Sequence, residues 1–573
     1  MAVQALRYFH TIRHLRPRQW LWRPYLRIQR QIYLRCSPLR RMFHARASAI
    51  ANRVAHRQPG PFLPTVEWEQ VDPQPHLRVA DDAVALEFTF LNQTIQFPGK
   101  IDWACKEASQ LWIYNLQYSA YLTSLGIAYR TTGRPQYFEA FKKIVSGWIE
   151  ANPFPSGDGW HAYVVSLRAV NWMFSLHLFS DRLDGETDFR QNVLTSLVKQ
   201  LEYIYYNLEL DVGGNHLLEN IKALCVAGAF FSGGHSEKWL YRGLALLQAE
   251  LKRQVLPDGG HFERSPMYHA IVLEDLLLIA AALRNAQLEP PETLHTDLQR
   301  MIHFYTQMLH PDGEIALFND AAFHIAPDPG SLLRLAGAVL NDLSLPAGKL
   351  DAAYAMLAKS SPNPGSGQSN TERTIAEFPH SGYYVVRRED TALFFDAGPV
   401  CPDDLPAHAH ADIFSYELSV GGTRWIVDSG VREYAAGPWR RYSRGTSAHN
   451  TVALDGQNQV DVWSSFRVGY RVKPTLVRCH QLEGATVLAG RHAGYGHNRA
   501  HSRLIVDIDS HTWLIIDEVA GSGDILVESF IHLHPDVSLS SDENSATLTA
   551  GAGVLRCLVA GAAATASLRG QTE

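Results

Sequence analysis

Two histidines and an aspartate alternate with alanines in the segment HAHAD, where His408, His410 and Asp412 occupy every second position. The flanking runs look like β-strands, and residues two apart in an extended chain face the same side. Farther along, Asp428 ends the run TRWIVDSG and His449 lies in RGTSAHNTV. Imidazole nitrogens and carboxylate oxygens on neighbouring strands can converge on one divalent ion, with zinc or manganese favoured over calcium. The alternative is that these are ordinary polar residues at strand ends.

A second polar group follows the glycines of DVGGNHLLEN. We expect these glycines to end one helix and Asn215 to cap the next, so that Asn215, His216 and Glu219 share one helical turn. A helix N-terminus has unpaired N–H groups and partial positive charge, and therefore favours an anion such as a carboxylate. The alternative is structural: Asn215 caps, His216 packs and Glu219 complements the helix dipole.

A third polar group lies in LPDGGHFERSPMYH, next to a glycine-rich loop. Ser265 is expected to cap a helix with Pro266 in its first position, which places Tyr268 on the opening turn. A tyrosine in such a place is also commonly a half-buried packing residue. Asn319 and Asp320, in GEIALFNDAAFH, add polar side chains at another helix–loop edge, with weaker specificity.

The elements that must position these residues change character along the chain. From about residue 105 to 360 apolar residues recur with a helical period, as in VLTSLVKQLEYIYYNLEL, which predicts about ten helices in antiparallel hairpins. The segment SSPNPGSGQSN then has the composition of a linker. Beyond it the period becomes two, as in TALFFDAG and TWLIIDEV. The sequence therefore predicts an α-helical domain followed by an antiparallel β-sandwich.

The composition is that of a soluble globular protein, with 46% apolar and 19% charged residues, and 573 residues favour two or three domains. No run of about 18 to 20 apolar residues occurs, so we expect no membrane-spanning segment. The six cysteines are scattered without a CxxC pair, which fits neither a disulfide scaffold nor a zinc ribbon. The sequence also lacks a phosphate-binding GxxxxGK(S/T) loop, a dinucleotide fingerprint, HExxH and GxSxG.

The N-terminal segment 1–66 contains thirteen Arg and no Lys, Asp or Glu, so it carries +13 while the whole chain carries −6. It lacks the apolar core of a secretory signal, which leaves a cytoplasmic and a periplasmic location open. The segment could lie on an anionic membrane, bind a polyanion, or dock as a helical arm on the protein's own acidic body. We favour the docked arm because Leu, Ile, Trp and Tyr recur at loosely helical spacing. No nucleic-acid-reading motif accompanies the arginines, so no nucleic-acid partner is expected.

Five segments, in this order, resemble the heparinase II/III family of polysaccharide lyases, which also includes alginate lyase relatives. The segments are NHLLEN, DGGHFERSPMYH, FND, HAHAD and RGTSAHNTV. The resemblance implies an incomplete (α/α) toroid of about ten helices followed by an antiparallel β-sandwich, in agreement with the periodicity. We expect the bounds to be 1–66 for the basic arm, 67–359 for the toroid, 360–371 for the linker and 372–573 for the sandwich.

The resemblance implies β-elimination at a uronic acid, with an acidic polysaccharide as substrate. Asn215 would hold and neutralise the uronate carboxylate, with His216 beside it. Tyr268 would be the acid and, for one sugar epimer, also the base, whereas His408 would be the base for the other epimer. A tyrosine has an ordinary pKa near 10, so it would need nearby positive charge to act as a base.

The resemblance divides the HAHAD segment between two roles. His408 would face the cleft, and His410, Asp428 and His449 would hold a structural divalent metal. This division conflicts with the expectation that His408 and His410 share a strand face, unless a bulge or strand end intervenes. Asp412 is left without a role.

Other residues are expected to line the cleft as stacking or polar contacts for an acidic sugar chain, with packing between helices as the alternative. They are Glu219, Trp112, Asn115, Arg168, Arg264, Tyr442 and Arg444.

Two other functions compete with the lyase. One is a metal-dependent glycan hydrolase, in which His410, Asp428 and His449 leave an open position that activates water. The other is a non-catalytic protein that binds acidic polysaccharide and keeps only the fold. Having both Asn215 and Tyr268 argues against a pure binder. The polysaccharide itself (a glycosaminoglycan, alginate or a bacterial exopolysaccharide) is not specified, and a homo-oligomer is compatible with the sequence.

Overall fold

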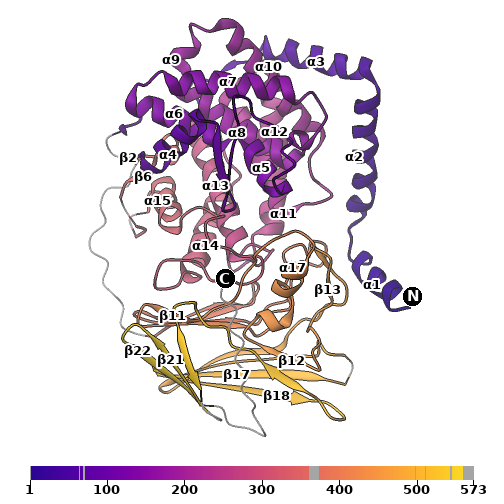
Figure 1. Cartoon of the computed structure of the whole chain (residues 1–573), viewed down its shortest axis with the longest axis vertical. Helices are drawn as coiled ribbons and strands as arrows, with labels where there is room; N and C mark the ends of the chain where they lie inside the picture. The colour runs from indigo at the N-terminus through magenta and orange to yellow at the C-terminus, as the bar shows by residue number, and fades with distance from the viewer. Residues whose placement is uncertain are drawn as a thin grey trace.

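The structure, a computed structural model, describes residues 2–558 except 64, 69, 70, 343, 347, 360–372, 497, 510 and 542–544. The expected linker at 360–371 therefore lies outside the described residues. Figure 1 shows a helical domain above, a β domain below, and an N-terminal arm along one side. The predicted order, an α-helical domain followed by antiparallel sheets, is confirmed.

The helical domain is built from helices that are joined in some places by short turns and in others by long loops. Its helices are α4 (Gln74–Val84), α5 (Gln110–Tyr118), α6 (Ala120–Thr132), α7 (Gln136–Ala151), α8 (Ala162–Leu178), α9 (Ser180–Leu183), α10 (Thr187–Tyr206), α11 (Gly214–Phe230), α12 (Gly234–Gln254), α13 (Pro266–Asn285), α14 (Leu294–Gln307), α15 (Pro329–Leu340) and α16 (Ala352–Ala355), with a 3₁₀ turn, η2 (Asp158–Trp160). Three short strand pairs brace the periphery: β1 (Ala55–His56) with β5 (Phe231–Ser232), β2 (Val71–Asp72) with β6 (Leu350–Asp351), and β3 (Glu87–Phe90) with β4 (Gln93–Gln96).

Helix α11 is the centre of this domain, because it is buried along nearly its whole length and packs against α8, α12 and α13. The close approach of α11 and α12 depends on glycine. A Cβ at Gly228 would lie 2.5 Å from Cβ of Leu240, and one at Gly243 would lie 2.8 Å from Sγ of Cys225. Within the described residues, only α13 is long and apolar enough to cross a membrane, and it is a mostly buried core helix.

The β domain contains two main antiparallel sheets. The first has the order β11 (Thr423–Ile426), β10 (Tyr416–Val420), β9 (Thr391–Asp396), β8 (Tyr383–Arg388), β7 (Thr374–Phe378). The second runs in order from β15 (Thr475–Leu482) through β16 (Ala485–His492) and β17 (Ala500–Asp509) to β18 (Thr512–Ala520). Smaller units are β12 (Val452–Leu454) with β19 (Val527–Ser529), β13 (Val462–Trp463) with β14 (Arg467–Val468), β20 (Ser538–Ser541) with β21 (Ser545–Ala550) and β22 (Gly553–Leu558), the helix α17 (Pro438–Ser443) and the 3₁₀ turn η3 (Thr446–Ala448).

The five-stranded sheet is buried on both faces, and this joins the two domains. On β8, Tyr383 and Val385 pack with Phe304 of α14, whereas Tyr384 and Val386 pack in the core of the sandwich. Because successive strand residues face opposite sides, a strand covered on both faces becomes a continuous apolar run. This explains the sequences YYVV and ALFF, and it packs the β domain against the helices.

The N-terminal arm consists of α1 (Ala2–Ile12), α2 (Pro17–Arg35) and α3 (Ser37–Ala51). Helix α3 packs against α10, and α1 lies against β14 of the β domain. The arm therefore reaches from the top of the helical domain to the β domain, as Figure 1 shows. The expected boundary after residue 66, like the one at 359, stays a prediction.

Candidate active site

A cavity of about 1910 Å³ lies where the helical domain, the β domain and the arm meet. The four residues expected to be catalytic, Asn215, His216, Tyr268 and His408, all line it. They come from three places in the chain: the first turn of α11, the first turn of α13, and the loop between β9 and β10. The fold thus brings together residues that are far apart in sequence.

The first turn of α11 differs from the expected cap. Gly213 is the N-cap, and both Gly213 and Gly214 have positive φ angles, of 75° and 56°. These angles favour glycine because a side chain would be strained there. The backbone N–H of Asn215 donates to Oε1 of Glu263 at 3.1 Å, so Glu263 takes the capping role. Asn215 is only 4% exposed but lines the cavity, where its carboxamide can meet an anionic ligand.

His216 is held by a buried carboxylate. Its Nδ1 lies 3.0 Å from Oε1 of Glu209, whose other oxygen accepts a hydrogen bond from Asn220. Burial lowers the pKa of His216, but the charge and hydrogen bond of Glu209 outweigh it, and the pKa lies above its ordinary value. His216 therefore tends to carry positive charge directly beside Asn215, which suits a ligand carboxylate.

Tyr268 has the predicted local structure: Ser265 caps α13 by accepting the N–H of Tyr268, and Pro266 is the first helical residue. Its hydroxyl lies 3.1 Å from the hydroxyl of Tyr434. Burial, with Tyr434 and the carboxylate of Asp320 nearby, raises the pKa of Tyr268 well above its ordinary value. Tyr268 thus keeps its proton, which suits a proton donor rather than a base.

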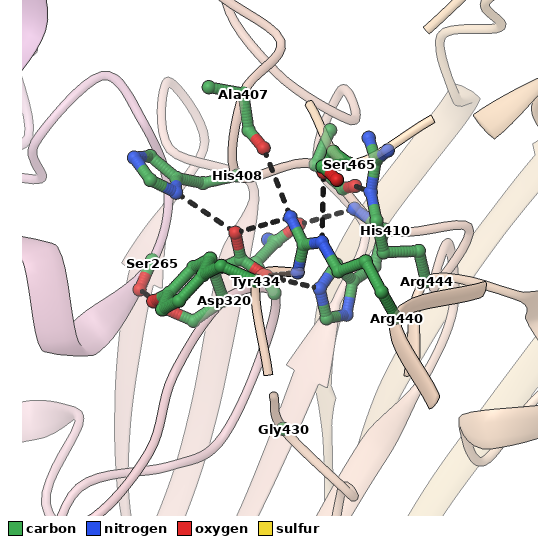
Figure 2. Close-up of polar contacts among 12 residues, drawn as sticks. Ser265, Asp320, Ala407, His408, His410, Gly430, Tyr434, Arg440, Arg444 and Ser465 are labelled. Carbon is green, nitrogen blue, oxygen red and sulfur yellow. Dashed lines mark hydrogen bonds and ion pairs between the residues drawn. The ribbon is translucent and has the colours of Figure 1, made fainter. Parts of the chain in front are cut away.

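The predicted strand face for His408 and His410 is wrong, because both lie in the loop between β9 and β10. They still converge, through Asp320. Its carboxylate contacts Nδ1 of His408 at 2.9 Å and Nε2 of His410 at 2.8 Å, and it pairs with the guanidinium of Arg440, as Figure 2 shows. With Nδ1 bound to Asp320, Nε2 of His408 is the nitrogen able to accept a proton, and it lies 3.4 Å from Oε2 of Glu263.

The charge of Asp320 is secure. Burial opposes its ionisation, but the hydrogen bonds from both histidines and the charge of Arg440 outweigh burial and hold the pKa well below its usual range. Arg440 also donates to the carbonyls of Ser465 and Ala407. Asp320 therefore connects three elements: its carboxylate binds the HAHAD loop and α17, and its backbone carbonyl accepts a hydrogen bond from the hydroxyl of Ser265 at the start of α13.

The buried cluster that could hold a metal ion differs in part from the expected ligand set. Potential ligand atoms of His410, Asp412 and His449 all lie within 4.8 Å of one another, and all three residues are buried. Nδ1 of His410, Oδ2 of Asp412 and Nε2 of His449 have no hydrogen-bond partner in the described chain. Asp428 instead binds Nδ1 of His449 at 2.8 Å. Two imidazoles and a carboxylate fit a zinc-like ion, with Asp428 orienting a ligand from behind.

The residues expected to contact substrate separate into two groups. Asn115 and Glu219 line the cavity. The structure differs from the expectation for Trp112 and Arg168, which are buried: Trp112 donates to the Gln93 carbonyl, and Arg168 donates to Gly159 and Gln200.

Three arginine and tyrosine candidates also lie away from the cavity lining. The guanidinium of Arg264 donates to the backbone of His380 and Ser381, across the domain interface. Arg444 is buried and donates to Ala409, which braces the HAHAD loop. Tyr442 is partly exposed, with its hydroxyl 3.5 Å from Nε2 of His532.

Sequence reasoning missed several residues that contact the candidate catalytic side chains. Glu209 contacts the imidazole of His216, and Glu263 accepts the backbone N–H of Asn215. Tyr434 contacts the hydroxyl of Tyr268, and Arg440 pairs with Asp320. Glu263 lies within a segment singled out from the sequence, so its position beside Ser265 was a usable signal. The other three lie in stretches with no distinguishing pattern.

Comparison with known proteins gives the family. Residues 48–326 match the profile of the heparinase II/III N-terminus, and residues 370–569 match that of the heparinase II/III-like C-terminal domain. A heparin-sulfate lyase of Bacteroides thetaiotaomicron is 23% identical over 79% of this chain and 66% of its own length. FtsZ-localized protein C of Caulobacter vibrioides is 27% identical over 58% of this chain and 55% of its own length.

A crystal structure of heparinase III has the same fold, with a TM-score of 0.66 and 20% identity over 84% of this chain and 77% of that one. The match to the Bacteroides lyase covers 66% of that protein, so this chain spans just under two thirds of its length. Two family profiles that together match most of the residues, and a shared two-domain fold, establish the relationship. The chain belongs to the heparinase II/III family.

Proposed function

We propose that this chain is a polysaccharide lyase that cleaves a uronate-containing polysaccharide by β-elimination. The observation that carries the proposal is the stacking of Tyr268 on His408, with ring centroids 3.7 Å apart, in the cavity that Asn215 and His216 also line. A proton donor, a proton acceptor and a carboxylate-binding pair thus border one space. Family membership and the heparin-sulfate lyase among its relatives support the same reaction class.

The reaction uses the residues as follows. The Asn215 amide and the His216 imidazolium bind the uronate carboxylate and make the neighbouring C–H bond acidic. Nε2 of His408 takes that proton, and the electron pair forms a carbon–carbon double bond while the glycosidic C–O bond breaks. The leaving oxygen takes the hydroxyl proton of Tyr268. Because Tyr268 holds its proton firmly, we assign the base to His408.

We also propose that His410, Asp412 and His449 hold a divalent ion, with zinc or manganese favoured. When bound, the ion would fix the HAHAD loop to the segment after η3, and so fix the position of His408. The ligand residues are at most 1% exposed, which argues against the hydrolase alternative because substrate cannot reach a water on the ion.

The test is ultraviolet absorbance during incubation with heparan sulfate, chondroitin, hyaluronan and alginate, since elimination produces an unsaturated uronate and hydrolysis does not. Glycosaminoglycans come first, given the heparin-sulfate lyase relative. We expect absorbance to rise with one polysaccharide and not to rise in Tyr268→Phe. Shortening of a polysaccharide without any rise in absorbance would overturn the lyase and favour a hydrolase. Binding without turnover would favour the non-catalytic alternative.

A further inference from the structure

Residues 1–47 precede the region matched by the family profiles, yet α1 contacts the β domain and α3 contacts the helical domain. On α1, the guanidinium of Arg7 pairs with Asp461 at 2.7 Å. Thr11 accepts the indole N–H of Trp463 at 3.2 Å, and Tyr8 meets the same indole edge-on. These contacts hold α1 on the β domain.

The start of α2 spans the two domains. Gln19 is buried, and its amide donates to the carbonyl of Asp211 in the helical domain and to that of Asp404 in the β domain, both at 3.1 Å. The Asp404 carboxylate also pairs with Arg16 at 2.8 Å. Asp404 lies four residues before His408, in the same loop. The arm is therefore connected to the loop that carries the proposed base.

The inner side of the arm borders the catalytic cavity itself. Trp20 and Arg23 line the same cavity as Asn215, Tyr268 and His408. Trp20 is 52% exposed, so a large part of its indole is open to a ligand. The guanidinium of Arg23 contacts Asp211 at two places, with Nε 3.6 Å from Oδ2 and an N–H donated to the carbonyl at 3.4 Å, and its side chain stays about half exposed. An open indole beside a guanidinium can receive a sugar ring and an acidic group together.

We propose that α1 and α2 form the outer wall of the substrate cleft, and that Trp20 and Arg23 bind sugar units of the acidic polysaccharide beyond the bond that is cleaved. Trp20 stacks on the C–H face of a pyranose ring, and Arg23 pairs with a uronate carboxylate or a sulfate. This inference rests on the proposed function, because it needs the cavity to hold that polymer. It predicts that the arm acts on long chains and not on the shortest ones.

The test uses full-length protein with Tyr268→Phe, so that binding is measured without turnover. The probes are labelled tetrasaccharides and dodecasaccharides of each polysaccharide in the panel. We expect Trp20→Ala and Arg23→Ala each to weaken dodecasaccharide binding about tenfold and to leave tetrasaccharide binding within about twofold. Leu21→Ala and Arg27→Ala are matched controls, since both residues belong to α2 and lie outside the cavity lining. Hydrogen exchange of α2 should slow when the dodecasaccharide binds.

The outcomes separate the two proposals. Equal dodecasaccharide binding by all four variants, with elimination intact in the otherwise unaltered protein, would overturn the role of the arm and leave the lyase. Equal weakening in the Leu21 and Arg27 controls would also overturn it, because the effect would then be general to the helix. If the unaltered protein neither binds nor cleaves any polysaccharide in the panel, the proposed function is wrong, and so is the proposal that the arm binds an acidic polysaccharide.

Discussion

The imidazole of His408 stacks on the phenol of Tyr268 with ring centroids 3.7 Å apart and an angle of 28° between the planes. Each ring has its own hydrogen-bond partner: Nδ1 of His408 binds the carboxylate of Asp320, and the hydroxyl of Tyr268 binds the hydroxyl of Tyr434. The two groups are therefore held side by side on one wall of the cavity. A base and an acid in this arrangement can both reach one bound uronate unit.

Removing the Tyr268 hydroxyl should abolish most of the activity without unfolding the protein. We expect Tyr268→Phe to lower kcat by about 10²- to 10⁴-fold, the usual contribution of a positioned acid. Tyr434→Phe removes the hydrogen-bond partner but not the acid, so its loss should be smaller. Initial rates followed by absorbance, with thermal unfolding as the control for folding, measure both. A larger loss in Tyr434→Phe would transfer the role of acid to Tyr434.

Asp320 should matter in two separable ways. Asp320→Asn leaves the buried guanidinium of Arg440 without its carboxylate, which should destabilise the protein by about 3–5 kcal/mol, and it weakens the hold on His408. The double variant Asp320→Asn/Arg440→Met removes the unpaired charge as well. We expect it to regain much of the unfolding free energy but not kcat/KM. Recovery of both quantities would mean that Asp320 serves stability alone.

The pH dependence should report on His216. Its pKa is raised by Glu209, so the imidazolium is present at low pH and is lost as the pH rises through that raised pKa. The contribution of His216 to binding a carboxylate should disappear in the same direction. In Glu209→Gln the raising charge is absent and burial lowers the pKa, so the alkaline fall in kcat/KM should move to lower pH. An unchanged profile in Glu209→Gln would show that His216 does not bind the uronate as a cation.

Much of this architecture could be predicted from the sequence, and the failures have local causes. Periodicity is a property of a single segment, so the change from period 3.6 to period 2 predicted the order of the two domains, helical first and then β. The alternation of His408, His410 and Asp412 was misleading. Polar residues at every second position also occur in this loop, which is held by Asp320 and Arg444 and is not a strand.

Pairing across the fold could not be predicted. The sequence offered both Asp412 and Asp428 beside His410 and His449, and the resemblance implied Asp428. Which carboxylate faces both imidazoles is settled only by the fold: Asp412 lies within 4.8 Å of both, and Asp428 contacts Nδ1 of His449. Trp112 and Arg168 look like residues that bind sugar, but they satisfy their polar groups inside the helical domain. The sequence does not distinguish an aromatic or cationic side chain in the core from one in the cleft.

A buried lysine next to the cavity should be important for stability. Nζ of Lys222 lies 2.5 Å from Asp275 and 2.9 Å from Glu219, and all three side chains are almost fully buried. Lys222→Met leaves two carboxylates buried without their cation, so we expect a loss of about 3–5 kcal/mol of unfolding free energy. The exposed Lys238→Met is the control and should change it by less than about 0.5 kcal/mol. Equal values in denaturant titrations would contradict the structural role of the cluster.

The metal content should distinguish Asp412 from Asp428. If His410, Asp412 and His449 bind the ion directly, His410→Ala and Asp412→Ala should each abolish stoichiometric metal in elemental analysis of the purified protein. Asp428→Asn should only weaken affinity, by about 10- to 100-fold, because Asp428 orients His449 from behind. Removing the ion with a chelator should lower the melting temperature. If Asp428→Asn loses the metal completely while Asp412→Ala retains it, Asp428 is the direct ligand, and the arrangement proposed for Asp412 is wrong.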